Sequence, residues 1–245
     1  MQHRYGLIGK DIGYSFSPGY FKEKFAAMGL EDHHYDNFDL PRIADFPSLV
    51  AHQPNLRGLN VTIPYKEAIL PYLDAVEGAA RAIGAVNTIA FGNGQLTGHN
   101  TDAYGFATSL APFLEKQPHK KALILGTGGA SKAVAHVLAQ WNIPFQYVSR
   151  SGKNNGLSYA ALSTETIAEY TLIVNCSPVG TFPKITDKPD LPYGGITPRH
   201  LLYDLIYNPA KTAFLAEGEQ RGAAISNGLE MLRQQAEKAW EIWTR

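Results

Sequence analysis

Three glycines, at positions 126, 128 and 129, stand between an apolar run and a helical pattern over residues 130–141. Glycine lets the backbone turn tightly and approach a ligand closely, because it has no Cβ atom. The helix that follows would direct unpaired N–H groups and the positive end of its dipole toward an anion. The spacing therefore indicates a nucleotide phosphate site, although the same glycines could simply shape a tight strand-to-helix turn.

The pattern around these glycines is that of a βαβ unit, which favours nucleotide binding. An apolar strand from Lys121 precedes the glycines, and a second strand, residues 145–149, follows the helix. The motif has the form G-x-G-x-x-S and departs from the usual dinucleotide pattern at its last position, where Gly or Ala is common. We expect the following residues to contact the cofactor: Gly126, Thr127, Gly128, Gly129, Ala130 and Ser131.

The residues at the end of the second strand indicate NADP. An NAD-binding unit commonly has an acidic residue there, which bonds the ribose 2′-hydroxyl, whereas an arginine accommodates a 2′-phosphate. This chain has Arg150 and no acid at that point, and a guanidinium binds phosphate oxygens in a bidentate manner. A polar surface loop with incidental charge is the alternative. We expect cofactor contacts from Ser149, Arg150, Ser151 and Lys153, and from the backbone of Gly228.

Two hydroxyls, those of Ser15 and Ser17, follow the first expected strand, residues 4–9. A helical pattern over residues 20–28 comes next. One serine would suffice to cap this helix. Two hydroxyls at the carboxyl end of a strand could equally hold a small carboxylate, and the residues alone leave both alternatives open.

A second polar group follows an apolar run further along the chain. The pattern predicts a strand, a helix and a strand over residues 33–38, 42–52 and 56–63, which implies parallel pairing. Ligands bind at the carboxyl edge of such sheets, and Asn60, Thr62 and Lys66 fall near that edge. Taken alone, Lys66 is more simply explained as a solvated lysine at a helix start.

Residues 85–102 are typical of a hairpin that leads into a helix ending near residue 114. Thr101 or Asp102 could be the N-cap of that helix, and the Asp102 carboxylate could equally face a ligand. We place the boundary between two domains at this helix. Residues 77–83 form a shorter predicted helix before the hairpin.

Two further strand and helix repeats complete the nucleotide domain. The pattern predicts strands over residues 171–176 and 201–207 and a helix over residues 212–221. Cys176 ends one of these strands and is more plausibly a packed small residue than a nucleophile.

The last predicted helix, residues 229–243, has an apolar stripe that indicates packing. The stripe consists of Leu229, Leu232, Ala236, Ala239, Trp240 and Trp243. Gln235 lies off this stripe, where it could reach a ligand or be solvated.

Composition narrows the class of partner. Lys plus Arg and Asp plus Glu both number 22, so no net charge recruits nucleic acid or an anionic membrane. The single cysteine excludes an intramolecular disulfide, and the chain shows no signal peptide or membrane-spanning run. We expect a cytoplasmic protein with a small-molecule partner. The eight histidines show no metal spacing, and the adjacent His33 and His34 would point to opposite faces of a strand, so we expect no metal.

Six blocks in register over nearly the whole chain resemble the shikimate dehydrogenase family. They comprise residues 15–18, 60–66, 84–88, 98–102, 126–131 and 228–235, and the run Tyr-Asp-Leu-Ile-Tyr-Asn-Pro at 203–209 adds to the resemblance. The family implies NADP-linked interconversion of 3-dehydroshikimate and shikimate, in the pathway to aromatic amino acids. It also implies an α/β fold of two domains that flank a cleft.

The expected domains are an N-terminal α/β substrate domain, residues 1–101 and 229–245, and a Rossmann-type doubly wound NADP domain, residues 102–228. The C-terminal helix would return to the substrate domain. By resemblance, Ser15 and Ser17 would bind the substrate carboxylate. The residues expected around the substrate's ring hydroxyls are Thr62, Lys66, Asn87, Asp102, Gln235 and, nearby, Tyr207.

Lys66 and Asp102 would form the catalytic pair. Reducing a ketone by hydride transfer builds negative charge on oxygen, which a nearby ammonium can stabilise and protonate. Asp102 would orient Lys66, and either residue could be the formal proton carrier. We expect a monomer or a homodimer.

The chain departs from the family pattern at two places. Phe21 and Lys22 stand where a His-Asn pair is common, and Ser149 stands where Asn is frequent. A quinate or dual quinate/shikimate dehydrogenase that uses NAD or NADP is the alternative within enzymes. A nucleotide-binding regulator without catalytic activity is the alternative outside them, and the presence of both Lys66 and Asp102 counts against it.

Overall fold

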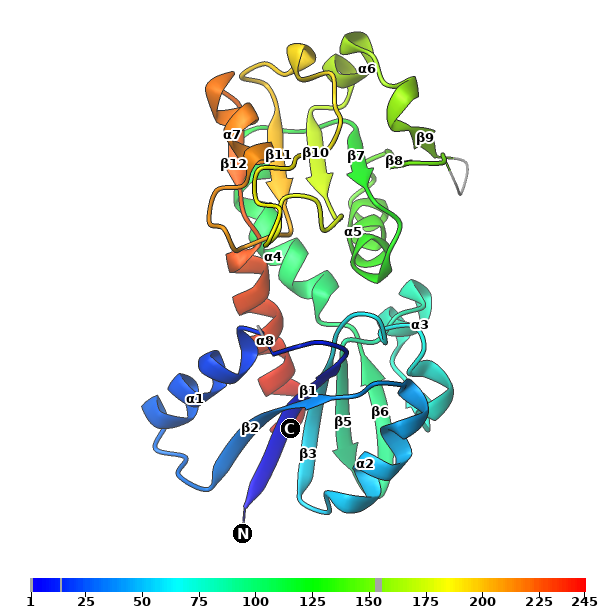
Figure 1. Cartoon of the computed structure of the whole chain (residues 1–245), viewed down its shortest axis with the longest axis vertical. Helices are drawn as coiled ribbons and strands as arrows, with labels where there is room; N and C mark the ends of the chain where they lie inside the picture. The colour runs from blue at the N-terminus through cyan, green and yellow to red at the C-terminus, as the bar shows by residue number, and fades with distance from the viewer. Residues whose placement is uncertain (1, 14, 153–155) are drawn as a thin grey trace. The chain divides into compact units, whose positions relative to one another are not determined.

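The chain folds into two compact α/β units (Figure 1). The computed structural model describes residues 2–13, 15–152 and 156–245. Unit 1 comprises Met1–Thr101 and Ala236–Arg245, and unit 2 comprises Asp102–Gln235. The last helix, α8 (Leu229–Trp243), therefore begins in unit 2 and ends in unit 1, whereas we expected the whole helix to belong to the substrate domain.

Unit 1 is built on a six-stranded mixed sheet with the order β2-β1-β3-β5-β6-β4. Its strands are β1 (His3–Gly9), β2 (His33–Asp39), β3 (Leu56–Val61), β4 (Ala75–Val76), β5 (Thr88–Gly92) and β6 (Gln95–His99). β1 pairs in parallel with β2 and β3, as the strand and helix pattern predicted, and β5 pairs antiparallel with β3 and β6. The carboxyl ends of β1, β3 and β6 and the amino end of β5 consequently lie at one edge of the sheet.

The helices of unit 1 are α1 (Ser17–Ala27), α2 (Phe46–His52) and α3 (Gly78–Ile83). The single helix expected over residues 42–52 is instead a 3₁₀ turn, Ile43–Asp45, followed by α2, and Pro47 lies in the first turn of α2. Proline suits a first helical turn, because its missing N–H would have no helical partner there. The β5–β6 hairpin turns at Asn93 and Gly94, both with positive φ, as in a type I′ turn.

Two apolar clusters cover the two faces of this sheet. Tyr5 and Leu7 point to one face of β1 and Ile8 to the other, as strand alternation requires. The first cluster includes residues of α1 and α8, and there Trp243 donates a hydrogen bond from Nε1 to the carbonyl of Ile89 at 3.0 Å. A Cβ at Gly58 would lie only 2.2 Å from that same Nε1, so only glycine allows the indole to lie on β3.

The packing stripe of α8 differs from the expected one. Ala236, Ala239 and Trp243 are buried as expected, but Met231 is buried in the first half of the helix, where we expected Leu229 and Leu232. Leu229 and Leu232 are only half-buried. The difference arises because the first half of α8 packs within unit 2 and the second half within unit 1.

Unit 2 is a doubly wound parallel sheet with the order β12-β11-β10-β7-β8-β9. Its strands are β7 (Ala122–Leu125), β8 (Phe145–Ser149), β9 (Leu157–Ser158), β10 (Leu172–Asn175), β11 (Leu201–Asp204) and β12 (Ala224–Ser226). Every strand pair in this order is parallel. The chain runs outward from β7 in one direction and from β10 in the other, so the strand order reverses between these two strands. This is the Rossmann-type arrangement.

The helices of unit 2 are α4 (Asp102–Lys116), α5 (Gly129–Gln140), α6 (Thr164–Glu169) and α7 (Ala213–Gln220), together with the first half of α8. α4 packs on β11 through Phe106, whose ring meets Tyr203 edge-on, and through Ser109, whose hydroxyl lies 2.6 Å from that of Tyr203. Tyr203 is fully buried, and burial raises its pKa to about 12. The sequence pattern did not predict the short elements β4, β9 and α6.

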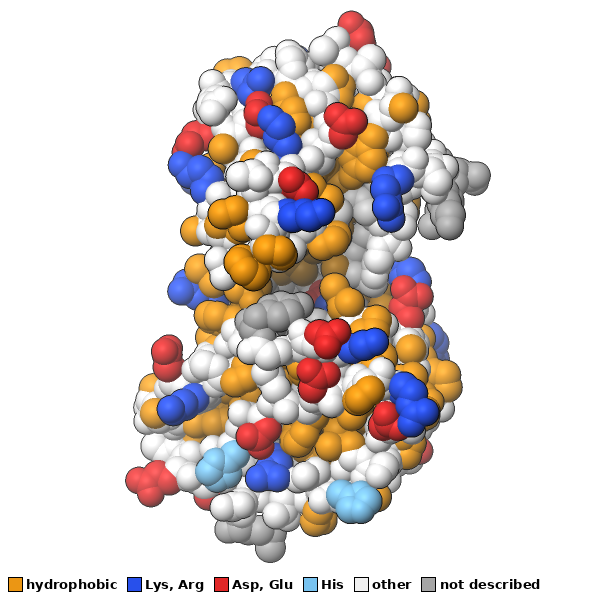
Figure 2. All heavy atoms as spheres, viewed as in Figure 1, with side chains coloured by type: hydrophobic (Ala, Val, Ile, Leu, Met, Phe, Trp, Pro, Cys, Tyr) orange, Lys and Arg blue, Asp and Glu red, His pale blue; other side chains and the backbone are white. Residues whose placement is uncertain are grey.

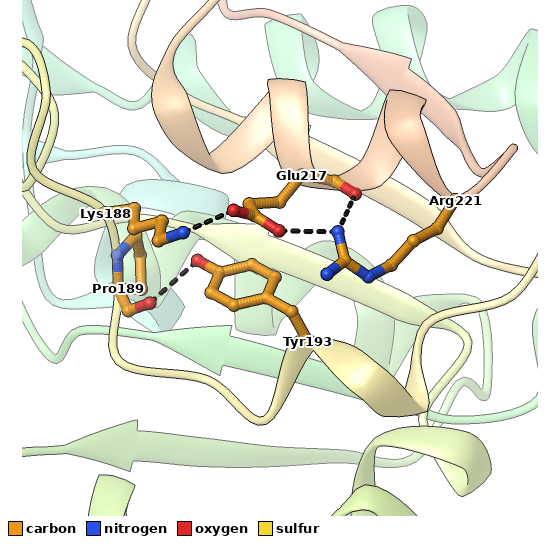
Figure 3. Close-up of polar contacts among 5 residues, drawn as sticks. All are labelled: Lys188, Pro189, Tyr193, Glu217 and Arg221. Carbon is orange, nitrogen blue, oxygen red and sulfur yellow. Dashed lines mark hydrogen bonds and ion pairs between the residues drawn. The ribbon is translucent and has the colours of Figure 1, made fainter.

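Glu217 of α7 holds the loop before β11 in place (Figure 3). It accepts hydrogen bonds from Lys188 and Arg221, and the bond from Lys188 is the main reason that its pKa lies below the usual value. Both cations also lie over the ring of Tyr193, at 4.9 Å and 5.9 Å from its centroid. The Tyr193 hydroxyl donates to the carbonyl of Pro189 at 2.7 Å, which closes the loop on itself, while the bond of Lys188 to Glu217 ties it to α7.

Charges of both signs alternate on the surface. Figure 2 shows one face of the molecule, on which Lys and Arg side chains are interspersed with Asp and Glu over both units. Ion pairs join some of these groups, for example Lys121 with Glu169 at 2.9 Å. Such interspersion keeps the local potential small. Among the described residues, no helix has the length and apolar character needed to cross a membrane.

Candidate functional site

Ser15 and Ser17 lie where β1 leads into α1, at the carboxyl edge of the unit 1 sheet. The Ser15 hydroxyl accepts a hydrogen bond from the backbone N–H of Ser17 at 3.2 Å. Phe16 occupies the N-cap position of α1, and no side chain among the described residues caps the helix. Neither serine is therefore the N-cap residue, but the Ser15 hydroxyl does bind the N–H of the first residue of α1. Ser17 is buried at the start of α1, and its side chain lies near the hydroxyl of Tyr35.

A buried polar network extends from Ser17 across this edge. The Tyr35 hydroxyl donates to Oδ1 of Asn60 at 2.8 Å, and burial raises the pKa of Tyr35, so the hydroxyl stays protonated. Nδ2 of Asn60 donates to the carbonyl of Asn87 at 3.3 Å and to the hydroxyl of Thr88 at 3.2 Å. Because buried polar groups without partners are costly, this network holds each member in one orientation.

Asn87 links the network to Thr101. Its Oδ1 accepts from the backbone N–H of Thr101 at 2.6 Å, and its Nδ2 donates to the Thr101 hydroxyl at 3.0 Å. Asp102, the next residue, is the first of α4 and is buried. Asn87 thus fixes the backbone and the side chain of Thr101, the last residue of the first segment of unit 1.

Thr62 and Lys66 follow β3 at the same edge. The N–H of Thr62 donates to the carbonyl of Ile8 at 2.9 Å, so the chain stays beside β1 for one residue after β3 ends. Lys66 lies in a turn rather than at a helix start and is half-buried. Its carbonyl accepts from the N–H of Val86 at 2.7 Å, which brings the Lys66 backbone beside the residue that precedes Asn87.

The sequence patterns gave no role to Tyr35, indicated Thr101 only as a possible helix cap, and indicated Asn60 only by its place near a strand end. Tyr35 contacts Ser17 and Asn60, which are far from it along the chain, so no local pattern reveals these contacts. Its place on an alternating strand does predict burial, and a buried tyrosine hydroxyl needs a partner. That is the only signal in the sequence that points to this residue.

The glycine turn lies where the strand order of unit 2 reverses. Gly126 follows β7 with φ +106°, a conformation that favours glycine, and a Cβ there would lie 3.3 Å from the backbone of Cys176 and Ser177, just after β10. A Cβ at Gly128 would meet nothing within 4 Å, so this N-cap residue of α5 faces open space. α5 begins at Gly129. The crevice at such a reversal point is where doubly wound sheets bind nucleotides.

Two of the residues expected to bind the cofactor are also needed for packing. Ser131 is fully buried, and its hydroxyl donates to the carbonyl of Gly128 at 2.7 Å. The Ser131 side chain therefore stabilises the glycine turn and points into the protein interior. A Cβ at Gly228 would lie 2.0 Å from the carbonyl oxygen of Leu205. Glycine is thus required there because the chain passes directly over the end of β11.

Ser149 ends β8, and Arg150 and Ser151 are exposed directly after it. These residues lie beside the glycine turn, because β8 pairs with β7 in parallel. The backbone turns back at Gly152, which has φ +61°. Lys153, the remaining residue expected here, lies outside the described residues.

A buried carboxylate joins the ends of β10 and β11. Asp204 is fully buried, and its carboxylate accepts from the Thr212 hydroxyl at 2.6 Å, from Nδ2 of Asn175 at 3.0 Å and from the N–H of Ile206 at 3.0 Å. Burial raises its pKa to about 6. The hydrogen bond from the N–H of Ile206 also explains why β11 ends at Asp204 and not at Tyr207 as expected. The Asp204 carboxylate takes the place that a backbone carbonyl of a neighbouring strand would occupy.

Cys176 has the properties of a packed residue. Burial, together with the charge of Asp204, raises the pKa of its thiol well above the usual value. A reactive cysteine needs a thiolate near neutral pH. The prediction that Cys176 is not a nucleophile therefore agrees with its surroundings.

Gln235 lies where α8 crosses α4. A Cβ at Gly105 would lie 2.5 Å from the carbonyl of Met231 and 3.1 Å from Cβ of Gln235, so the two helices approach with backbone nearly in contact. Asp102 precedes Gly105 by three residues and lies on the same face of α4. Asp102 and Gln235 thus flank one helix crossing within unit 2. Tyr207 is half-buried in the loop after β11.

The structure divides the expected site residues between the two units. Unit 1 brings five of them to one sheet edge, namely Ser15, Ser17, Thr62, Lys66 and Asn87. Unit 2 holds Asp102, Tyr207, Gln235 and the expected cofactor residues. The expected catalytic pair therefore takes one residue from each unit.

Comparison with known proteins identifies the family. Residues 7–89 match the shikimate dehydrogenase substrate binding domain. A protein of Desulforamulus reducens named shikimate dehydrogenase (NADP(+)) is 37% identical, with 98% of this chain and 89% of that protein covered.

Solved structures agree. Shikimate 5-dehydrogenase of Thermus thermophilus, in complex with NADP(H) and shikimate, has a TM-score of 0.87 at 32% identity, and the match covers 99% of this chain and 94% of that one. Quinate dehydrogenase of Corynebacterium glutamicum, in complex with NAD, has a TM-score of 0.89 at 28% identity with the same coverage. Because the similarity extends over nearly all of both units, the chain belongs to the shikimate dehydrogenase family.

Proposed function

We propose that this chain is an NADP-dependent shikimate dehydrogenase, which reversibly reduces 3-dehydroshikimate to shikimate in the pathway to aromatic amino acids. The main support is the set of hydroxyl, amide and ammonium groups at one edge of unit 1, in a chain related over 98% of its length to a protein of that name. In this proposal unit 1 is the substrate domain and unit 2 is the NADP domain.

The substrate carboxylate binds at Ser15 and Ser17. The backbone N–H of Ser17 points to Ser15 and its side chain meets Tyr35, so the two hydroxyls are held in a defined orientation before any ligand arrives. Such preorganisation lowers the entropy cost of binding. The ring hydroxyls of the substrate meet the polar side chains of Thr62, Asn87, Tyr207 and Gln235.

Lys66 and Asp102 carry the chemistry. NADPH, when bound, supplies the hydride. The ammonium of Lys66 stabilises the negative charge that develops on the substrate oxygen, and Lys66 or Asp102 delivers the proton to that oxygen. Asn87 supports the substrate side of this arrangement, because its side chain positions Thr101 within unit 1.

The residues of unit 2 fit a dinucleotide with a 2′-phosphate. The open N-cap at Gly128 and the positive φ of Gly126 leave room for a pyrophosphate near the start of α5. Arg150 is exposed after β8, at the position that distinguishes NADP from NAD. Ser131 shapes the glycine turn and Gly228 shapes the loop at the end of β11. The remaining residues proposed to contact the cofactor are Thr127, Gly129, Ala130, Ser149 and Ser151.

The cellular location, oligomeric state and partners of the enzyme are also inferred. We infer a cytoplasmic protein, monomeric or homodimeric, whose partners are small molecules and not nucleic acid or membrane. The balanced and interspersed surface charge supports this inference.

A quinate or dual quinate/shikimate dehydrogenase is the second candidate, and the similarity to a quinate dehydrogenase bound to NAD favours it. Steady-state oxidation assays of shikimate and quinate, each with NADP and NAD, separate the two. We expect the highest kcat/KM for shikimate with NADP. A higher kcat/KM for quinate would establish the second candidate, and tight NADPH binding without turnover of either acid would indicate a regulator.

A further inference from the structure

Three potential metal ligands converge at the opposite edge of the unit 1 sheet. They are His3 at the start of β1, Asp32 in the turn before β2, and His33 at the start of β2, and their ligating atoms all lie within 4.8 Å of one another. Nδ1 of His33 lies 2.8 Å from one carboxylate oxygen of Asp32, and Nε2 of His3 lies 3.8 Å from the other. Both imidazoles therefore direct a nitrogen to the same carboxylate.

The sheet itself builds this group. His3 and His33 are direct partners in the parallel β1–β2 pair, so their side chains project from the same face of neighbouring strands. The backbone N–H of His3 donates to the carbonyl of Asp32 at 2.9 Å, which holds the turn against β1. The two imidazole rings stack at 4.7 Å, and His33 also stacks against Tyr5. The three ligands are thus preorganised by backbone pairing and ring packing.

We propose that His3, Asp32 and His33 form a binding site for a divalent transition metal, with Zn²⁺ as the ion that this ligand set suits best. Two imidazoles and one carboxylate are common zinc ligands, and water can complete a four-coordinate shell. Bond lengths of about 2.0–2.2 Å place tetrahedral ligand atoms about 3.3–3.5 Å apart. Side-chain rotations must therefore close a separation of up to 4.8 Å by about 1.5 Å and open the 2.8 Å contact of His33 with Asp32 slightly. Asp32 is exposed, so an ion can reach the site from solvent.

The expectation of no metal site rested on spacing along the chain. In the sequence His33 stands beside His34, and strand alternation directs these two side chains to opposite faces. The sequence does not reveal that His3, thirty positions earlier, lies beside His33 on the neighbouring strand. The site also lies at the amino ends of β1 and β2, away from the edge that holds Ser15 and Lys66. It is therefore independent of the proposed dehydrogenase reaction.

Calorimetric titration of the tag-free, chelator-treated protein with ZnCl₂ tests the proposal. We expect saturable binding of one Zn²⁺ per chain and a higher Tm with zinc. His3→Ala and Asp32→Asn should each raise the Kd at least tenfold. His34→Ala is the matched control, because it removes an exposed imidazole on the opposite face, and it should leave the Kd unchanged within twofold.

A second readout covers the case in which a variant folds poorly. Co²⁺ bound by nitrogen and oxygen ligands gives a visible absorption spectrum, which should appear with the parent protein and with His34→Ala but not with Asp32→Asn. Shikimate turnover should be the same with and without zinc. Absence of stoichiometric binding, or equal weakening by His3→Ala and His34→Ala, would overturn the proposal.

Discussion

At the scale of single residues, the proposed substrate edge depends on hydroxyl and amide groups that bond one another within unit 1. Ser17, Tyr35, Asn60 and Asn87 form one connected network, and none of these side chains is more than slightly exposed. Lys66 differs from them, because it lies in a turn after β3 and is only half-buried. The network orients the substrate in our proposal, whereas the lysine acts on the reacting oxygen, so the two call for different kinetic tests.

Replacing Lys66 by alanine should lower kcat by about two to four powers of ten, or about 3–5 kcal/mol, because the ammonium would act on charge that develops only in the transition state. The KM for shikimate should change much less. Steady-state kinetics with NADP would measure both values. Lys22→Ala, at an exposed position of α1, is the control, and near-normal turnover of Lys66→Ala would remove this residue from catalysis.

Replacing Arg150 by alanine should raise the KM for NADPH by about tenfold and leave the KM for NADH unchanged, since only NADPH carries the 2′-phosphate that a guanidinium would bind. Both constants come from initial rates at saturating 3-dehydroshikimate. Arg199→Ala, an exposed arginine elsewhere in unit 2, should alter neither. An equal change for the two cofactors would argue against a phosphate contact.

Replacing Tyr35 by phenylalanine should raise the KM for shikimate about three- to tenfold while kcat stays within about threefold, because the lost hydroxyl orients Ser17 and Asn60 without touching the reacting atoms. Steady-state kinetics and urea unfolding of the same samples would separate binding from stability. Tyr193→Phe also loses a buried tyrosine hydrogen bond, but in unit 2, and its shikimate KM should stay unchanged. Equal KM effects in the two variants would reject the positioning role.

At the scale of elements, the ends of strands and helices are determined by side chains that replace backbone partners. Asp204 is the clearest case, because its carboxylate ends β11, holds Asn175 at the end of β10 and contacts Thr212, the residue that caps α7. Three elements of unit 2 thus meet at one buried acid.

The pKa of Asp204 predicts a pH dependence of stability. Its folded-state pKa of about 6 exceeds the model-peptide value of 3.8, so the folded protein binds more protons than the unfolded chain between these values. The free energy of unfolding should therefore fall by up to about 3 kcal/mol through this group as pH rises from about 4 to about 7.

Asp204→Asn keeps the shape of the side chain and removes the titration. Urea unfolding at several pH values should show a decline for the parent protein that is reduced in this variant, while other titrating groups affect both equally. Thr212 can reverse its hydrogen bond to meet the new amide. Parallel curves for the two proteins would contradict the assignment.

The sequence pattern predicted the long elements well, because apolar runs and helical periodicity report burial directly. It missed β4, β9 and α6, which are too short to show a period. It extended β3 to Ile63 and β11 to Tyr207, since apolar residues continue past the point where pairing ends. The motifs placed the candidate residues near strand ends. They did not indicate Tyr35, whose partner Asn60 is distant in the chain, or Asp204, whose partner Asn175 lies on another strand.

At the scale of the whole molecule, unit 1 is discontinuous, and its second segment, Ala236–Arg245, covers one face of its sheet. Trp243→Ala should destabilise unit 1 by about 3–5 kcal/mol, because it leaves a large cavity beside Gly58 and removes the bond to Ile89. Hydrogen exchange should show faster exchange in β1 and β3 with β7 and β10 little changed. Trp141→Ala, at the partly exposed end of α5, is the control, and uniform loss of protection in both units would contradict this view.

This discontinuity has a consequence for biosynthesis. A ribosome makes residues 1–101 first, yet the aromatic side chains of Tyr5 and Phe21 gain their α8 neighbours only after all of unit 2 has been translated. The nascent unit 1 must therefore wait with an uncovered apolar face while unit 2 can already fold. Chaperones that recognise exposed aromatic surface would meet this chain at its N-terminal third, and a ribosome stalled before codon 236 would display that face for as long as the stall lasts.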